Sequence, residues 1–589
     1  MPGEVLDGFI GLGVGMNAVL SPTILPPGSF ARGINLSARG ALVHTRPGFV
    51  QESLKAPAGV FQGAGVWSLE SGDRIAFVVA GVVYVWVVDT AVLHTVGTLL
   101  DATAQCYFVQ AERYMIIQDG SSDPVLLQDN SGTPGIVPSW EYVSPDDAGT
   151  MIEGPSVPPG FSMVFAHGRI HMVPTHIPNT VPPQEGRATI ISGDIQLPSA
   201  ARTLLEFVEN DYLSEGGANG LPLELGFVGG LGVVRNAATG TGAGEVVAIG
   251  RNGVVAFDFS IPRSMWKTQP LSKVLFTGPG TKSPWAVLSL NDDLIYRGLD
   301  GLRALRYTAS QTAGGSGALS NTPLSFEVGT FLEDDGAYLR YVSATACDNR
   351  LFLTAGGLKD RYFRGMISWD VAAAFYNGSP GPGAYDGLWT GFDMAQVLTA
   401  LRAGVPTAFV FGRGPVLYSV DPDASVDTQL DGTRTRIQAR VHTAGLSFQD
   451  PFQVKKLRHV ELWLSGIRED TDIVVYYRPG GYPLWQQLGT RGIKVAAGSL
   501  PQVRRRVRVP LDFSQDSCDA TTGEPLYSAT AFEFAIQWTG CAKIERFRAS
   551  AEPVGEAPAD ACSETESKLL SAGAASGVTL ADDSYSIGG

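Results

Sequence analysis

One pattern recurs between about residues 60 and 420 of the 589-residue chain: a β-rich run, a short polar turn and a second β-rich run. In each case β-branched and aromatic residues flank turn formers that accept a positive φ, which is the signature of a β-hairpin. The seven pairs are Gln62–Leu69 with Ile75–Ala80, Tyr107–Gln110 with Tyr114–Gln118, Ser162–Phe165 with Ile170–Val173, Glu245–Ile249 with Val254–Phe257, Ala286–Leu290 with Leu294–Arg297, Val342–Ala346 with Leu351–Thr354, and Thr407–Phe411 with Val416–Val420. A chain with so many local hairpins is expected to be all-β.

The spacing of these hairpins favours a β-propeller. They occur about once per 50 residues, close to the span of one four-stranded blade. Gly (71) and Pro (37) make up about 18% of the chain against about 12% on average, an excess that many tight turns require. A sandwich array or several small barrels would give similar local signals. A propeller closes the run of hairpins with few exposed edges.

The pattern changes after residue 430. Residues 431–555 contain longer alternating runs, typical of an antiparallel β-sandwich. We therefore expect an extended N-terminal arm with the first strands over residues 1–58, a propeller over 59–430, a sandwich over 431–555 and a flexible acidic tail over 556–589. Short helices are expected in connections, at Val371–Phe375 and Met394–Leu401.

Charge, cysteine spacing and hydropathy argue against several classes of protein. The net charge is −15, with −14 in residues 1–430, +4 in residues 431–555 and −5 in the last 34 residues. Such an acidic chain is not expected to bind nucleic acid generally, because it repels phosphates. The five cysteines are widely spaced without a CxxC pair, which argues against a disulfide framework or a zinc site. The longest apolar run, Ile75–Val88, is too short for a membrane-spanning helix. The apolar stretch near the N-terminus has no basic region before it, so it is not expected to be a signal peptide.

No group of residues indicates catalysis, a metal or a cofactor. His167, His171 and His176 lack the fixed spacing of metal ligands. The acid pairs at 146–147, 292–293 and 334–335 lie in predicted turns, where Asp is locally favoured. Asp421, Asp423 and Asp427 faintly resemble a calcium loop without its central Gly and terminal Glu, so a solvated loop is preferred. The spaced glycines at 240, 242 and 244 precede a strand rather than a helix. We expect a protein that is not an enzyme.

Basic residues of the predicted sandwich form the best candidate site. In the run Val503–Val509, alternation places Arg504, Arg506 and Arg508 on one strand face and Arg505 on the other with the valines. The candidate interface consists of Lys455, Lys456, Arg458, Arg504, Arg506 and Arg508. Contact with nucleic acid, contact with the acidic propeller of an adjacent copy and a solvated strand face all remain open.

Several stretches resemble the tail tubular or nozzle proteins of short-tailed bacteriophages, taken with their propeller-bearing relatives. In order along the chain, they are Pro22, Leu25–Phe30, Asn35, Arg39–Leu42, Arg46–Phe49, Phe108–Gln110, Tyr114–Pro124, Gly168-Arg169, Pro262-Arg263, Trp266, Ser283-Pro284, Asn291–Asp293, Asp300–Arg303, Asn349–Leu351 and Gly387–Trp389. The resemblance covers most of residues 20–420.

This resemblance implies a structural virion protein. The family forms a homo-hexameric ring, or nozzle, below the portal and adaptor, through which the double-stranded DNA genome is ejected without sequence-specific binding. The implied partners are copies of itself, the portal–adaptor complex and tail fibres or spikes. The implied location is the virion tail, after synthesis in the host cytoplasm. A propeller-type polysaccharide depolymerase and a receptor-binding tail protein are the alternatives.

Overall fold

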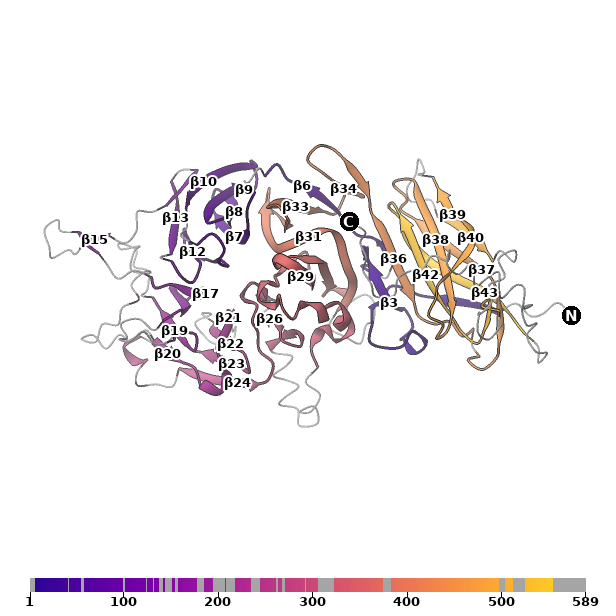
Figure 1. Cartoon of the computed structure of the whole chain (residues 1–589), viewed down its shortest axis with the longest axis horizontal. Helices are drawn as coiled ribbons and strands as arrows, with labels where there is room; N and C mark the ends of the chain where they lie inside the picture. Colours follow the sequence, from indigo (N-terminus) through magenta and orange to yellow (C-terminus); the bar gives the residue numbers. More distant parts are fainter. Residues whose placement is uncertain are drawn as a thin grey trace.

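The computed structural model is all-β, with a disc of radiating sheets joined to a two-sheet sandwich (Figure 1). The structure describes residues 6–554 except 41, 55–57, 99–100, 123, 131, 137–140, 144–150, 154–156, 177–184, 194–206, 208–217, 235–243, 261–262, 267, 269–270, 292, 306–321, 374–382, 449, 497–503 and 512–524. The acidic tail expected over 556–589 lies outside these residues. No helix within the described ranges has the length and apolar character needed to cross a membrane.

Seven blades can be followed in the described part of the chain. The first blade consists of β7 (Phe61–Leu69), β8 (Gly72–Val79), β9 (Val82–Val87) and β10 (Val92–Thr98), and the second consists of β11 (Tyr107–Ala111), β12 (Tyr114–Gln118), β13 (Val125–Asn130) and β14 (Thr133–Ile136). The third blade consists of β17 (Gly160–Ala166), β18 (Arg169–Pro174), β19 (Thr189–Ser192) and β20 (Ala218–Gly220). The fourth blade consists of β21 (Val228–Val234), β22 (Glu245–Gly250), β23 (Gly253–Phe257) and β24 (Ser272–Thr277). A separate hairpin, β15 (Glu141–Val143) with β16 (Met151–Glu153), follows the second blade.

The last three blades use strands from both ends of the chain. The fifth blade consists of β25 (Val287–Leu290), β26 (Asp293–Gly298) and β27 (Gly301–Ala304). The sixth consists of β28 (Ala344–Cys347), β29 (Arg350–Gly357), β30 (Phe363–Asp370) and the first half of β31 (Ala384–Arg402). The seventh consists of the second half of β31, β32 (Val405–Gly412), β33 (Val416–Asp421) and β6 (Gly48–Gln51). The seven hairpins predicted from the sequence fall one in each blade.

The innermost strands close a ring. β7, β11, β17, β21, β25, β28 and β31 each contact the next, and β31 contacts β7 again. Closure of this ring confirms the propeller and excludes a sandwich array or a set of separate barrels for this region.

Side chains of one inner strand bind the backbone of the next, at what we call the blade seams. The Gln396 amide accepts from Ala64 N at 2.7 Å and donates to Ala64 O at 2.8 Å. Gln110 makes the same pair of bonds to Ser68 N (2.7 Å) and Ser68 O (2.6 Å). Serine hydroxyls bind the neighbouring inner strand at three more seams, through Ser162 with Leu231, Ser289 with Val233 and Ser343 with Val397. Each inner strand is the edge of its blade, so its outward backbone N–H and C=O groups have no neighbouring strand to pair with. These hydrogen bonds satisfy some of those groups.

The expected helix at Met394–Leu401 is wrong, because these residues belong to the 19-residue strand β31. Its first half pairs with β30 and its second half with β32, and the register shifts between Met394 and Gln396, where the chain passes from one blade to the next. Most residues of the second half are buried on both faces, so the period-2 alternation that marks a strand is missing. Of the other expected helix, Val371 and Ala372 form a turn, and 374–375 lie outside the described residues.

The sandwich consists of two antiparallel sheets that share one core. One contains β3 (Ser29–Ile34), β36 (Gln438–Thr443), β42 (Phe532–Thr539), β38 (Thr471–Pro479) and β39 (Gln486–Val495). The other contains β1 (Leu6–Ile10), β4 (Leu36–Ser37), β5 (Val43–Thr45), β43 (Lys543–Pro553), β37 (Lys455–Ser465), β40 (Arg505–Pro510) and β41 (Ser528–Ala529).

The N-terminal arm joins the two halves into one sheet. β6 completes the seventh blade by pairing with β33, while β3 pairs with both β31 and β36. A continuous path of hydrogen-bonded strands therefore runs from the last two blades, which share β31, into the sandwich. The predicted domain boundaries stay a prediction.

A buried arginine of the arm lies at this junction. The Arg46 side chain is 1% exposed and forms a bidentate pair with Asp427 of β34 (Val426–Thr428), at 2.7 and 2.8 Å. Its remaining donors reach Thr390 O at 2.6 Å and Asn35 Oδ1 at 3.0 Å, and its guanidinium lies 4.1 Å from the centre of the Phe49 ring. Arg46 also donates to Pro47 O at 2.8 Å, so its partners come from three parts of the chain, the arm, β31 and β34.

Asn35 extends this network into the sandwich. Its amide nitrogen donates to Thr390 Oγ1 and to Gln438 O, both at 3.0 Å, and its amide oxygen accepts from Thr390 N at 2.6 Å. The arm, the sixth and seventh blades and strand β36 are thus fixed by one polar cluster. We call Asn35, Arg46, Thr390, Asp427 and Gln438 the junction cluster.

Substitution of Asp427 by Ala is expected to destabilise the protein strongly. It leaves the Arg46 charge buried without its carboxylate, a loss that typically lowers the free energy of unfolding by about 3–5 kcal/mol. Chemical denaturation of D427A and of the control D423A, at an exposed turn position of the same segment, measures the difference. An equal effect in both variants would contradict the assigned role of Asp427.

A buried histidine of the third blade predicts loss of stability in acid. His171 bonds Ser192 Oγ at 2.7 Å and stacks on Phe259. Burial, with a smaller effect of His167, lowers the pKa of His171 to about 3. Below the ordinary histidine pKa of about 6.5, the unfolded chain takes up a proton that the folded protein does not. The free energy of unfolding therefore decreases by about 1.4 kcal/mol for each unit by which the pH is lowered.

The variant His171→Phe keeps the aromatic stack and removes the titration. It should be less stable than the wild type at pH 8, yet lose about 2 kcal/mol less between pH 6.5 and pH 5. Denaturant titrations at several pH values measure this slope. His94→Phe, at a partly exposed position of β10, is the control, and a slope equal to the wild type's in H171F would contradict the prediction.

Candidate interaction surface on the sandwich

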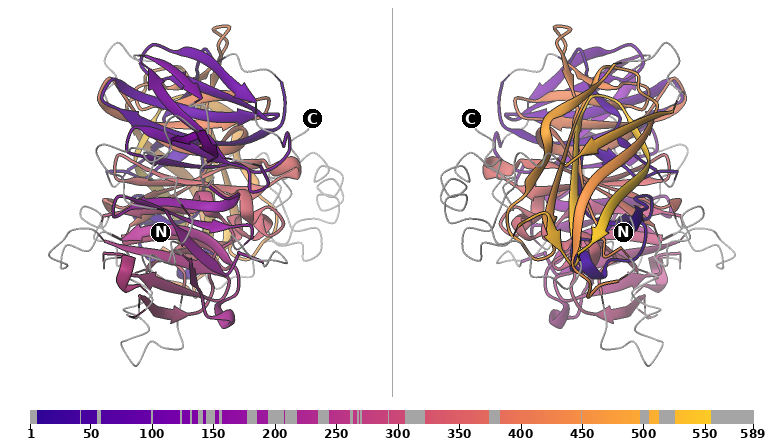
Figure 2. Two further views of the ribbon diagram at one scale, coloured as in Figure 1. Left: turned by 90° about the vertical axis from the view of Figure 1, so that its left-hand side faces the viewer. Right: turned by 90° about the vertical axis from the view of Figure 1, so that its right-hand side faces the viewer.

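The structure brings the predicted basic residues onto neighbouring strands. β37 and β40 pair antiparallel, which places Glu461 opposite Arg508 and Trp463 opposite Arg506. The predicted alternation of this run holds in β40, since Val507 and Val509 are buried while Arg506 and Arg508 are exposed. These strands belong to the sheet farthest from the propeller (Figures 1 and 2).

Lys455 does not belong to an exposed surface. Its side chain is buried, and its ammonium donates to Gln453 O at 2.8 Å, to Thr530 O at 3.3 Å and to Asp450 O. Burial lowers the pKa of Lys455, although nearby Asp450 opposes this shift. The buried position of Lys455 therefore does not support its place in the predicted interface. The side chain instead holds the loop before β37 through these hydrogen bonds. Lys456 lies 4.6 Å from the Tyr527 ring centre.

The four predicted arginines lie at the surface, with partners beside them. Arg458 pairs with Glu552, Arg504 with Glu545 at 2.7 Å, and Arg506 with Glu461. Arg508 donates to His459 Nδ1 at 3.2 Å. The arginine side chains nevertheless stay open to solvent, at 47% for Arg458, 71% for Arg504 and 56% for Arg506.

Glu461 is the buried centre of this surface. Its carboxylate also contacts Arg548 at 3.1 Å. Burial alone would raise the pKa of Glu461, but the hydrogen bond from Arg506 and the charge of Arg548 outweigh it and hold the pKa below its usual range. Glu461 therefore stays ionised and orders the arginines around it.

Three residues of this surface escaped the sequence reasoning. Arg546 and Arg548 lie on β43, and Phe9, 65% exposed, lies on β1 opposite Arg548. We call the combined surface of Arg458, Arg504, Arg506, Arg508, Arg546 and Arg548 the arginine face. The alternating run Lys543–Ala549 gave a signal for the two arginines, whereas no local signal places β1 beside β43.

Trp285 contacts residues of several blades near the inner strands of the propeller. This residue of η5 (Pro284–Ala286) donates from Nε1 to Cys106 O of the second blade at 3.0 Å and lies near Tyr341 before the sixth. A Cβ on Gly63 of the first blade would lie 2.7 Å from its ring. A cavity of about 290 Å³ remains between the inner strands beneath it.

The other candidate groups have structural surroundings. His167 bonds Gly244 O, His171 is buried, and His176 forms a bridge with Glu185. Within the described ranges, no set of three or more His, Cys, Asp or Glu side chains could hold a metal ion.

Of the predicted acid pairs, Asp334 and Asp335 lie within the described residues, and their surroundings differ. Asp335 is buried against Arg297, and Asp334 is exposed. The pair at 146–147 and residue 292 lie outside the described residues. Asp427, interpreted from the sequence as part of a solvated loop, is instead the partner of Arg46.

Comparisons with known proteins add little about function. No protein-family model matches the sequence, and no curated protein is similar to it. Among solved structures, a chain of a mitotic checkpoint complex is 10% identical and covers 64% of this chain and 96% of its own, with a TM-score of 0.33.

Two further structures give similar values. A BBS1N chain in complex with ARL6DN is 8% identical, covering 65% of this chain and 99% of its own. The β-propeller domain of Cps50 (Swd1) from Myceliophteria thermophila is 10% identical, covering 62% and 98%. Both have TM-scores of 0.33, and none of these likenesses carries a functional conclusion.

Substitution of Lys455 distinguishes a structural from an interface role. Lys455→Ala leaves three carbonyl groups without their shared donor, which should lower the free energy of unfolding by about 2 kcal/mol and increase cleavage of the 450–454 loop by protease. Denaturation and limited proteolysis measure both effects. Lys456→Ala is the control, and a K455A variant as stable as K456A would contradict the structural role.

Proposed function

We propose that this protein is a structural subunit of the virion tail of a short-tailed bacteriophage, where copies form a ring around the path of the ejected DNA. The observation that carries the proposal is the continuous sheet from the last two blades through β31 and β3 into the sandwich. A ring requires each subunit to hold a fixed angle between its two contact surfaces. The shared sheet and the junction cluster supply that rigidity.

The charges of the two halves support contact between copies. Residues 1–430 carry a net charge of −14, of which residues 1–58 contribute +1 and residues 59–430 contribute −15. The arginine face lies at the far end of the molecule from the propeller (Figure 1). Opposite charges at opposite ends favour a head-to-tail contact and fix its orientation more than its affinity. Such a contact continues from copy to copy until the ring closes.

The axis of each propeller is not the proposed path of DNA. Trp285 donates a hydrogen bond to Cys106 O across two blades, and the cavity of about 290 Å³ among β11, β17, β21 and β25 is far too small for a duplex. The genome would instead pass along the axis of the ring. Acidic walls there would repel the phosphates and let the duplex slide without binding.

Several of the stretches that resemble nozzle proteins lie beside the N-terminal arm, where Asn35 N donates to Leu388 O at 2.9 Å. Arg350 donates to Ser37 Oγ at 2.6 Å, and Trp389 Nε1 donates to Leu36 O at 2.8 Å. Asn35 and Arg46 belong to the junction cluster beside them. Residues of this resemblance thus hold the arm to the sixth and seventh blades, which suits a scaffold and supports the proposal.

The mass and shape of the purified protein test the proposal. Native mass spectrometry should give a hexamer, and negative-stain images should show a six-fold ring. A stable trimer that adsorbs to host cells would favour a receptor-binding protein, and release of reducing sugars from host capsule would favour a depolymerase. Either result would overturn the ring assignment.

Neutralising part of the arginine face should weaken the ring. The double variant Arg504→Gln, Arg508→Gln leaves Arg506 and Arg548 on the buried Glu461, so the fold should be preserved. The dissociation constant between copies should rise about tenfold, as for loss of about 1.4 kcal/mol, with a smaller effect at high salt. Analytical ultracentrifugation measures it. R413Q, at a half-exposed arginine of the propeller, is the control and should assemble like the wild type.

A further inference from the structure

A rigid loop of the sandwich presents an exposed aromatic ring. Phe452 is 90% exposed. Its backbone N–H donates to Asp450 Oδ1 at 2.9 Å, and the next one, of Gln453, does so at 3.2 Å. Lys455 holds the same loop through three carbonyl oxygens. An aromatic side chain this exposed is available to be buried in a pocket of a partner, as aromatic anchors are at protein–protein contacts.

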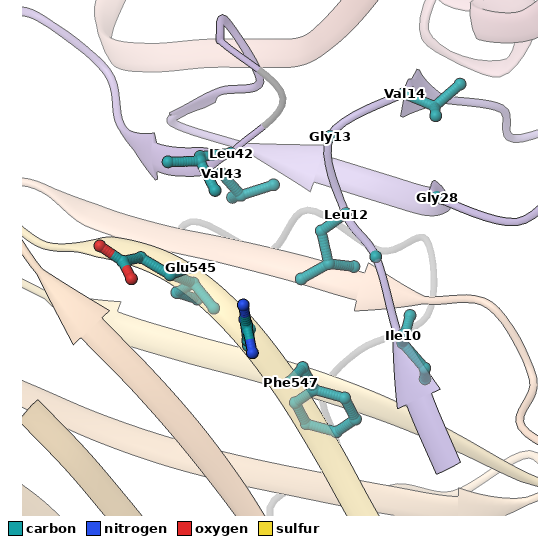
Figure 3. Close-up of a pocket in the computed structure, with 12 residues that line it drawn as sticks. Ile10, Leu12, Gly13, Val14, Gly28, Leu42, Val43, Glu545 and Phe547 are labelled. Carbon is teal, nitrogen blue, oxygen red and sulfur yellow. The ribbon is translucent and has the colours of Figure 1, made fainter. Parts of the chain in front are cut away.

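The same sandwich contains an apolar pocket. It has a volume of about 230 Å³ and is lined by Ile10, Leu12, Leu42 and Phe547 among others (Figure 3). Glycines at 11, 13 and 28 form part of its wall and leave the space open. A cavity of about 150 Å³ with a similar lining holds benzene, so this pocket has room for a phenyl ring.

The pocket lies at a gap in the sheet edge. On this side of β43, β5 pairs with Lys543 and Ile544, and β1 pairs with Phe547 onward. No described strand pairs with Glu545 and Arg546 on that edge. Their side chains line the pocket beside its apolar residues, and Arg546 connects it to the arginine face.

Phe452 cannot reach the pocket of its own chain. Its loop ends at Lys455, which pairs with Pro553, while the pocket lies at Ile544–Phe547 of the same strand β43. Six residues of strand separate the two positions, or about 20 Å. A shift of one copy relative to another along the strand direction would bring them together.

We infer that Phe452 of one copy inserts into the pocket of Ile10, Leu12, Leu42 and Phe547 in the next copy. The inference rests on the proposed ring, and it adds a contact between the sandwiches of neighbouring copies to the contact between the arginine face and the propeller. Exposed Asp450 stands two residues before Phe452, and exposed Arg546 stands at the rim of the pocket, so their charges complement each other across the contact. Each copy uses its loop on one side and its pocket on the other, which is a head-to-tail contact.

Assembly of Phe452→Ser tests the anchor. The dissociation constant between copies should rise at least thirtyfold, as is common for a central aromatic anchor, while thermal unfolding of the monomer stays unchanged because the ring is exposed. Phe227→Ser, at a 54% exposed phenylalanine before β21, is the matched control and should assemble normally. Sedimentation velocity over a concentration series measures all three proteins.

Disulfide crosslinking tests the position of the contact. With Cys518 and Cys562 replaced by Ser, the pair Phe452→Cys, Leu42→Cys should give a covalent ladder between copies on oxidation, and the pair Phe227→Cys, Leu42→Cys should not. If the wild type forms a ring while F452S assembles equally well and no ladder appears, the anchor is overturned and the ring stands. If the wild type stays monomeric and no ladder forms at high concentration, both proposals are overturned.

Discussion

The buried guanidinium of Arg46 is the constraint on which the arrangement of this molecule depends. A charge removed from water is tolerated only when its donors are satisfied, and here the acceptors come from the arm, β31 and β34. Asn35 adds the first residue of β36 to the same cluster. These segments are far apart in the sequence, so a single polar cluster fixes the arm, the last blades and the sandwich relative to one another.

Local signals explain why the propeller could be predicted. Each hairpin carries its own turn chemistry, and all seven predicted hairpins occur in separate blades. The closure of the ring depends instead on pairing between Gly48–Gln51 and Val416–Asp421, which no local pattern reveals. The same applies to β31, whose second half is buried on both faces and therefore lacks the alternation that marks a half-exposed strand. The sequence therefore predicted the strand pairing within each blade but not the pairing between segments from the two ends of the chain.

The arginine face shows the same division. Alternation in Val503–Val509 placed Arg504, Arg506 and Arg508 together because the pattern belongs to a single strand. Lys455 was assigned to the surface because a lysine is usually exposed, whereas its acceptors are main-chain carbonyls, one of them at Thr530. Phe9 was missed because β1 and β43 come from opposite ends of the sequence. Residue type and period predict which face a side chain takes, but not what a distant segment places beside it.

Rigidity and symmetry are connected in a molecule of this design. The angle between successive copies in a ring is set by the angle between the two contact surfaces of one copy, and a flexible link between propeller and sandwich would spread that angle over several closures. The hydrogen-bonded path through β31, β3 and β36 links the propeller to the sandwich by paired strands. In the proposed ring, the number of subunits would therefore depend on the junction cluster inside the subunit as well as on the surfaces that touch. Residues such as Asn35 and Arg46 would then be constrained by the symmetry of the assembly even though they contact no neighbouring copy.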